Sequence, residues 1–190
     1  MLHRPPAVVL DACVLANFTI SDLLLKLAED PVLFLPRWSD EIFAEVRRTH
    51  RKLKWKDEIA ESWQQEVRSA FPEAFFNPQK EIVSRLTNHA KDRHVLGTAI
   101  LSKSDTIVTF NLKDFKPAAL EPWGVVAVSP DDFLCQLYDV HSGLMAFKIT
   151  DLAKRHTLKG LIAKIRRTAP RFADIVERDS GRPGSVSSNN

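Results

Sequence analysis

Short apolar runs alternate with longer amphipathic segments along most of this chain. Four runs of four or five residues read as strands buried on both faces: Ala7–Leu10, Val32–Leu35, Thr106–Phe110 and Val125–Val128. The segments between them place apolar residues at helical spacing. Strands that alternate with helices favour a mostly parallel sheet covered on both faces, so we predict an α/β fold.

Capping residues predict where several of the helices begin. Ser21 is expected to start a helix that ends near Ala28, and Ser39 a second one, with acids in its first turn where the helix dipole favours them. A third helix is expected from Asp57 to Ala70, with an inner face that contains Ile59, Trp63 and Val67. Further helices are expected after Asp92 and from Pro130 to Val140, whereas residues 78–83 could be helical or extended.

The character of the chain changes at His141, after which the pattern is helical only. Residues 141–178 carry apolar stripes flanked by lysines and arginines. Such amphipathic basic helices could dock on the α/β unit, hold nucleic acid or bind a partner, and periodicity does not choose among these. We therefore expect an α/β domain over residues 1–140, a basic helical extension over 141–178 and a disordered low-complexity tail over 179–190.

Charged residues are distributed unevenly along the chain, although the overall composition is ordinary. The chain is 44% hydrophobic and 27% charged, which excludes a wholly disordered protein. Residues 1–140 carry 17 Lys and Arg against 20 Asp and Glu, while residues 141–190 carry 10 against 4. This asymmetry suggests a basic face for phosphates or for an acidic partner. With no membrane-length apolar run and no signal-peptide core, we expect a cytoplasmic protein in which Cys13 and Cys135 are buried, unbridged side chains.

Four acids stand at or near the boundaries of these elements. Asp11 ends the first strand, Glu45 lies beside the apolar stripe of the second helix, Asp92 begins a later helix and Asp114 follows the Thr106–Phe110 strand. Each has an ordinary structural explanation, as a helix N-cap or a solvated surface acid. In open α/β sheets, however, ligands bind beyond the carboxyl ends of the strands, so the four acids could meet there.

Converging carboxylates would repel one another unless a cation neutralised them. A cluster of oxygen ligands suits Mg²⁺ or Mn²⁺, whereas zinc is not supported by any Cys or His spacing. Such an ion can activate water and stabilise the charge that develops on a phosphodiester. The chain has no Gly-rich phosphate loop and no G-x-S-x-G elbow, which argues against an NTPase and a serine hydrolase.

A basic segment follows Glu45 and carries one aromatic residue, Trp55. Cations with an interleaved aromatic suit a nucleic-acid backbone and an unstacked base, although basic helix ends are also common on solvated surfaces. The candidate phosphate contacts in this segment are Arg47, Arg48, Arg51, Lys52 and Lys54.

Four stretches together resemble the successive motifs of PIN-domain nucleases, and more narrowly the VapC-like toxins of type II toxin–antitoxin systems. They are Val9–Leu15, Trp38–Glu45, Lys91–Leu96 and Ile107–Phe115, and the resemblance covers residues 7–140. Cys13 stands where many members have a small polar residue, and Asn111 where many have an acid. Whether Asn111 or Asp114 reaches the metal is therefore open.

The resemblance implies a three-layer α/β/α sandwich with a central parallel sheet and a metal-dependent endoribonuclease that inhibits translation. It further implies a cognate antitoxin partner, and PIN-domain toxins commonly form homodimers. By motif, Asp11, Glu45, Asp92 and Asp114 carry over as catalytic metal ligands, with Thr109 and Asn111 as supporting residues. We expect an RNA substrate of the tRNA or rRNA class. A catalytically silent binding module and a structure-specific DNA nuclease are the alternative interpretations.

Overall fold

Four short parallel strands form the centre of the structure, a computed structural model that describes residues 5–155 and 157–181. The strands are β1 (Ala7–Leu10), β2 (Leu35–Arg37), β3 (Thr106–Val108) and β4 (Val126–Val128), and they lie in the order β2-β1-β3-β4. Val9 of β1 lies opposite Arg37 on one side and Ile107 on the other. Because every pair is parallel, the residues that follow β1 and β3 emerge side by side at one edge of the sheet.

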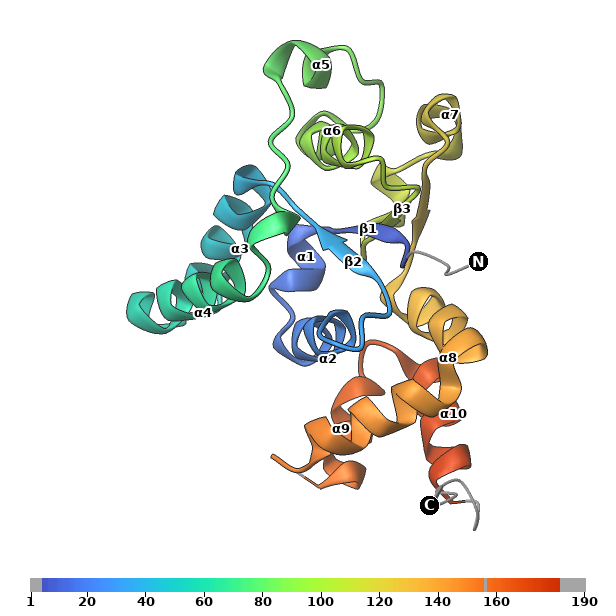
Figure 1. The fold of residues 1–190 in the computed structure, drawn as a ribbon. Helices are drawn as coiled ribbons and strands as arrows, with labels where there is room; N and C mark the ends of the chain where they lie inside the picture. Colours follow the sequence, from blue (N-terminus) through green and yellow to red (C-terminus); the bar gives the residue numbers. More distant parts are fainter. Residues whose placement is uncertain (1–4, 156, 182–190) are drawn as a thin grey trace.

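Helices cover both faces of this sheet, as Figure 1 shows. α6 packs on one face against β1, β2 and β3, while α2 and α8 pack together on the other. The predicted three-layer α/β/α arrangement is confirmed. The helices are α1 (Ala12–Leu15), α2 (Phe18–Ala28), α3 (Asp40–Lys52), α4 (Asp57–Ala70), α5 (Lys80–Ser84), α6 (Arg93–Ser102), α7 (Pro117–Leu120), α8 (Pro130–Ala153), α9 (Leu158–Ile165) and α10 (Pro170–Ser180). Short 3-10 turns are η1 (Pro72–Ala74), η2 (Ala90–Asp92), η3 (Leu112–Asp114) and η4 (Glu121–Trp123).

Several predicted boundaries were wrong. β3 ends at Val108, two residues before the predicted Phe110, and β4 begins at Val126, one residue after the predicted Val125. α2 begins at Phe18 instead of near Ser21, because the Asn17 side chain accepts a hydrogen bond from the backbone N–H of Ile20 and caps the helix. The second strand begins at Leu35 and includes Pro36, which we expected to end it. A proline is tolerated there because β2 lies at the edge of the sheet and pairs with β1 alone.

The predicted inner face of α4 is also partly wrong. Ala60 and Val67 are buried and Trp63 is half-buried, but the side chain of Ile59 is 55% exposed. A shift of one position along a helix turns the side chain by about 100°, so a face centred on Ala60, Trp63 and Val67 leaves Ile59 at its margin.

The C-terminal helices dock on the α/β unit. α8 continues past Val140 to Ala153, with a non-helical backbone at His141 (φ −130°, ψ 35°), and α9 and α10 pack beside it. Met145, Phe172 and other apolar residues of this region belong to the same buried core as β1. α10 extends to Ser180, and the rest of the expected disordered tail, residues 182–190, lies outside the described residues. No helix within residues 5–155 and 157–181 combines the length and hydrophobicity needed to cross a membrane.

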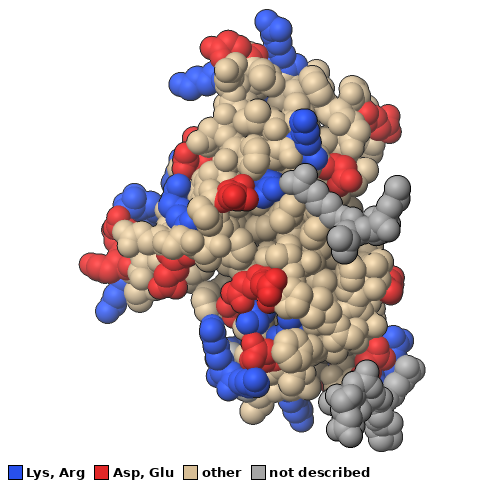
Figure 2. All heavy atoms as spheres, in the orientation of Figure 1, with Lys and Arg blue, Asp and Glu red and all other residues tan. Residues whose placement is uncertain are grey.

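Many basic side chains of the C-terminal helices are paired with acids of the same region. Arg166 forms ion pairs with Asp174 and Glu177, and Arg171 contacts Asp132 at 2.7 Å. On the face seen in Figure 2, basic and acidic side chains are interspersed in the part of the view occupied by α8 and α9. The positive charge counted in the sequence is thus partly neutralised within the fold.

Candidate active site

Asp11 occupies the junction between the central strand β1 and the short helix α1. Its backbone N–H donates to the carbonyl of Val108 in β3 (3.1 Å), and its Oδ1 accepts from the N–H of Ala12 (2.6 Å). Asp11 is therefore the N-cap of α1, which is the alternative structural role expected from the sequence. Only one of its two carboxylate oxygens caps the helix. The residue is 2% exposed, so its second oxygen also needs partners.

Thr109 and Cys13 supply those partners. The Thr109 hydroxyl donates to Asp11 Oδ2 at 2.6 Å, and the Cys13 thiol donates to the same oxygen at 3.2 Å. Burial raises the pKa of Cys13 to about 12, and the negative charge of Asp11 contributes to the rise. Cys13 is therefore a protonated hydrogen-bond donor that helps to hold Asp11. It is unbridged as expected, but both it and Cys135 are half-buried and not fully buried.

Glu45 lies midway along α3, in the turn after the acids that interact with the helix dipole. Its carboxylate is 3.5 Å from Arg48 Nη2 and 3.7 Å from His94 Nε2 of α6. Burial raises the pKa of Glu45, and the nearby Asp11 and Asp92 carboxylates raise it further, while His94 and Arg48 act in the opposite direction. The charges of Asp11 and Asp92, which belong to other segments, therefore affect the pKa of Glu45. Glu45 is half-buried near these acids and is not a fully solvated surface residue.

Asp92 stands at the start of α6, yet its side chain forms no capping hydrogen bond with that helix. Its Oδ2 lies 3.2 Å from His89 Nδ1. Burial raises the pKa of Asp92, and the negative charges of Asp11 and Asp114 add to the rise. The N-cap explanation therefore fails for this residue, which is 8% exposed.

Asp11, Glu45 and Asp92 line one cavity of about 320 Å³. They come from the end of β1, the middle of α3 and the start of α6, elements far apart in the sequence. The same cavity is lined by Ala12, Cys13, Arg48, Thr49, Lys52 and Asn111. The fold thus brings together three of the four acids predicted from the sequence.

Asp114, the fourth acid, lies outside this cavity. One carboxylate oxygen of Asp114, one of Asp92 and one ring nitrogen of His89 all lie within 4.8 Å of one another. Asn111 lies in the cavity instead, and its backbone N–H donates to the Thr109 hydroxyl (2.9 Å). Asp92 therefore belongs to both groups, and His89 is a neighbour that sequence patterns did not indicate.

The donor set of the cavity fits a hard divalent cation. Three residues with carboxylate side chains line the cavity, and carboxylate oxygens are ligands that Mg²⁺ and Mn²⁺ prefer. Burial is the main cause of the raised pKa values of Glu45 and Asp92, and the negative charge of neighbouring carboxylates adds to both. A bound cation would relieve the repulsion between these carboxylates. Within the described residues, the group of three whose ligand atoms all lie within 4.8 Å of one another is His89, Asp92 and Asp114; Asp11 and Glu45 share a cavity with Asp92 but do not form so close a group with it.

The basic segment after Glu45 divides into two groups. Arg48 and Lys52 line the acidic cavity, whereas Arg47 and Arg51 lie next to Glu61 and Asp57 of α4, at 3.8 and 3.0 Å. Lys54 is exposed at the turn between the helices, with φ of 60°.

The only aromatic side chain of this segment, Trp55, is packed against a neighbour. It stacks on His50 with ring centroids 4.1 Å apart and an interplanar angle of 2°. One face of the indole is therefore already covered, which leaves less of it for an unstacked base than we expected from the sequence.

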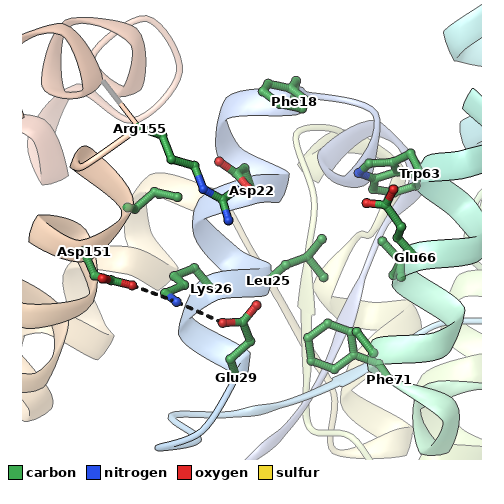
Figure 3. Close-up of a pocket in the computed structure, with 13 residues that line it drawn as sticks. Phe18, Asp22, Leu25, Lys26, Glu29, Trp63, Glu66, Phe71, Asp151 and Arg155 are labelled. Atoms are coloured by element: carbon green, nitrogen blue, oxygen red, sulfur yellow. Dashed lines mark hydrogen bonds and ion pairs between the residues drawn. The ribbon is translucent and has the colours of Figure 1, made fainter. Parts of the chain in front are cut away.

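A second hollow, of about 380 Å³, lies between α2, α4 and the second half of α8 (Figure 3). Lys26 contacts Glu29 and Asp151 there, each at 3.0 Å. This hollow shares no lining residue with the acidic cavity, and two of its acids, Glu29 and Asp151, are paired with Lys26. The candidate chemistry therefore belongs to the acidic cavity.

Comparison with known proteins finds a similar protein over most of the chain. The chain is 31% identical over 143 residues to a protein of Mycobacterium tuberculosis (strain ATCC 25618 / H37Rv) named "Putative ribonuclease VapC50". The similarity covers 70% of this chain and 84% of that protein. No protein-family model and no solved structure matches the chain.

Proposed function

This chain belongs to the family of VapC-like PIN-domain ribonuclease toxins, and we propose that it hydrolyses RNA phosphodiester bonds with a divalent cation held by Asp11, Glu45 and Asp92. The observation that carries the proposal is the meeting of these three carboxylates, from three distant segments, in one cavity. A catalytically silent scaffold would have no need to keep mutually repelling acids in a partly buried site.

We propose Mg²⁺ or Mn²⁺ as the ion, because the metal-ligating atoms available in the cavity are mainly carboxylate oxygens. When bound, such an ion supplies an activated water and stabilises negative charge on the phosphate. Asp11 is the most rigid ligand, since Thr109 and Cys13 hold one oxygen and Ala12 the other. Asn111 supports it from the same wall, and Asp114 acts from outside the cavity through its position beside Asp92.

Arg48 and Lys52 are the proposed phosphate contacts of the cavity. They lie on the α3 face that also carries Glu45, at helical spacings of three and seven residues. Cations in this position would counter the charge of the RNA backbone beside the carboxylates. Arg47, Arg51 and Lys54 belong to the same basic segment but lie outside the cavity, and they would contact the RNA on either side of it.

The biological role that we propose is that of a toxin in a type II toxin–antitoxin system. Cleavage of tRNA or rRNA would inhibit translation in the cytoplasm, and a cognate antitoxin would restrain the enzyme. A homodimer remains a prediction from the family resemblance. The relative in Mycobacterium tuberculosis supports the ribonuclease activity through its name.

Cleavage of defined RNA tests this proposal. Purified protein is incubated with tRNA, rRNA fragments and matched single- and double-stranded DNA in Mg²⁺, in EDTA, and with Asp92→Asn in place of the wild type. We expect RNA cleavage that needs both the ion and Asp92. Equal cleavage in all three conditions would refute the metal site, cleavage of DNA alone would identify a DNA nuclease, and no cleavage with retained RNA binding would identify a silent module.

A further inference from the structure

A separate hollow of about 520 Å³ lies beside the acidic cavity, between the segment that precedes α6 and the segment that runs from η3 to α7. Its size is in the range of small-ligand pockets. Lys113 and Lys116 are exposed at its lining, and Ala118 and Ala119 provide apolar surface. The hollow therefore combines positive charge with a small apolar wall.

Asn88 lines this hollow and carries a buried amide whose polar atoms are not used within the described part of the chain. The residue is 4% exposed, and neither its Oδ1 nor its Nδ2 has a hydrogen-bond partner among the described residues. Buried side-chain amides without partners are costly, and native proteins generally satisfy them. An unused donor next to an unused acceptor is the pattern that hydrogen-bonds the edge of a nucleobase.

His89 and Asp114 connect the hollow to the acidic cavity. Both residues line the hollow, and both lie beside Asp92, which lines the cavity. The side chain of His89 is 50% exposed, so its ring is available to stack on a base. A chain whose phosphate sits at Asp92 would therefore place its neighbouring nucleotide at this hollow.

We propose that this hollow is a subsite for one unstacked nucleotide of single-stranded RNA, next to the phosphate that is cleaved. The amide atoms of Asn88 are closed off from solvent in the free protein, so the side chain turns into the hollow when the base binds and then reads the base edge. His89 stacks on the base, and Lys113 and Lys116 contact the flanking phosphates. This inference rests on the proposed ribonuclease function and adds a determinant of sequence preference to it.

Replacement of Asn88 by leucine tests whether this residue reads the base or only stabilises the fold. Binding is measured in EDTA, where no cleavage occurs, with labelled hexaribonucleotides that differ at one central base. We expect the wild type to favour one base by about tenfold, in line with the discrimination of a side chain that makes two hydrogen bonds to a base, and Asn88→Leu to lose that preference. Because leucine removes an unpartnered buried amide, the melting temperature should stay the same or rise.

The two lysines are tested by the salt dependence of the same binding reaction. For single strands, the slope of log K against log salt changes by about 0.7 for each phosphate contact. Lys113→Ala combined with Lys116→Ala should therefore reduce the slope by about 1.4. Lys159→Ala is the matched control, because Lys159 is an exposed lysine on α9, outside the residues that line the hollow, and its slope should equal that of the wild type.

These outcomes separate the subsite from the nuclease. If the wild type cleaves RNA but Asn88→Leu keeps the full base preference, or the wild type has no preference, the subsite is refuted and the nuclease stands. If the wild type does not cleave RNA but the preference and its loss are observed, the nuclease is refuted and a base-reading site stands. A lower melting temperature with an unchanged preference would show that Asn88 is structural.

Discussion

The hydroxyl of Thr109 donates a hydrogen bond of 2.6 Å to the carboxylate of Asp11, and so joins the residue that follows β3 to the residue that follows β1. Thr109 is fully buried, and its hydroxyl oxygen also accepts from the N–H of Asn111. The chain that leaves β3 is thus fixed relative to the main candidate metal ligand. The pairing of β1 with β3 places these residues side by side.

Removal of this hydroxyl should reduce activity more than stability. In Thr109→Val the shape is nearly conserved, but the Asp11 carboxylate loses one of its two 2.6 Å hydrogen bonds and the Asn111 N–H loses its acceptor. We expect a loss of RNA cleavage of about 10- to 100-fold, the usual effect of removing a group that orients a metal ligand, while the fold is retained. Steady-state cleavage and thermal unfolding measure the two effects. Thr109→Ser keeps the hydroxyl and should keep activity; equal activity in Thr109→Val would contradict the positioning role.

Cys13 should resist thiol reagents in the folded protein. Because burial and the charge of Asp11 raise its pKa to about 12, the reactive thiolate is scarce at neutral pH. We expect no modification of Cys13 by iodoacetamide at neutral pH, and rapid modification once the protein is unfolded in urea. Mass spectrometry of peptides from the two samples measures this difference. Rapid labelling of folded Cys13 would show that the thiol does not donate to Asp11.

The crowded acids should make the metal-free protein less stable as pH rises. Folding raises the pKa of Asp92 and of Glu45 above their usual values of 3.8 and 4.5. The folded state therefore favours the protonated form of each carboxyl. This stabilisation is complete below the usual pKa values and is lost as pH rises through the higher pKa values of the folded protein. We expect Mg²⁺ to increase the melting temperature more at neutral pH than at acidic pH, because it binds the ionised form.

Asp92→Asn is the control for this effect. It removes one ionisable carboxyl, so the metal-free variant should lose less stability with rising pH and respond less to Mg²⁺. Thermal unfolding with and without the ion, over a series of pH values, measures both changes. A Mg²⁺ response that is the same for both proteins, or the same at every pH, would contradict the cation site.

Lys148 of α8 should be important for the attachment of the C-terminal helices. Its ammonium group donates to the backbone carbonyls of Lys26 (3.1 Å) and Glu29 (2.9 Å), at the C-terminal end of α2 where the helix dipole favours a cation. The residue is 2% exposed. Lys148→Met should lower the free energy of unfolding by about 2 kcal/mol, the range for hydrogen bonds from a charged donor. Urea unfolding measures this, and Lys159→Met, on the exposed surface of α9, should change it little.

The sequence was sufficient to predict the layers of the fold. It also predicted that four acids would meet, and three of them line one cavity. Apolar runs that end in a carboxylate or a polar side chain predicted parallel strands with Asp11 at their carboxyl edge, and Ser39 does cap α3. These predictions succeed because they depend on local patterns and on one topological rule about where parallel strands end. The position of Glu45 beside the apolar stripe of α3 is also a local pattern, and it identified Glu45 as a candidate ligand.

Contacts between distant segments could not be predicted in this way. Nothing in the local pattern relates His94 to Glu45 or His89 to Asp114, because these neighbours depend on how α6 and η3 are placed. The choice between Asn111 and Asp114 was open for the same reason. Asn111 immediately precedes η3 and Asp114 is its last residue, and the structure has Asn111 at the acidic cavity.

The Mg²⁺ concentration that gives half-maximal RNA cleavage tests the central claim most directly. In Glu45→Gln the cavity loses one charged ligand, so we expect this concentration to rise by at least about tenfold, the scale on which changes around a metal ligand alter affinity. Glu58→Gln, an exposed position in the first turn of α4, should leave it unchanged. The same midpoint in both variants and the wild type, or full cleavage in EDTA, would contradict a cation held by Asp11, Glu45 and Asp92.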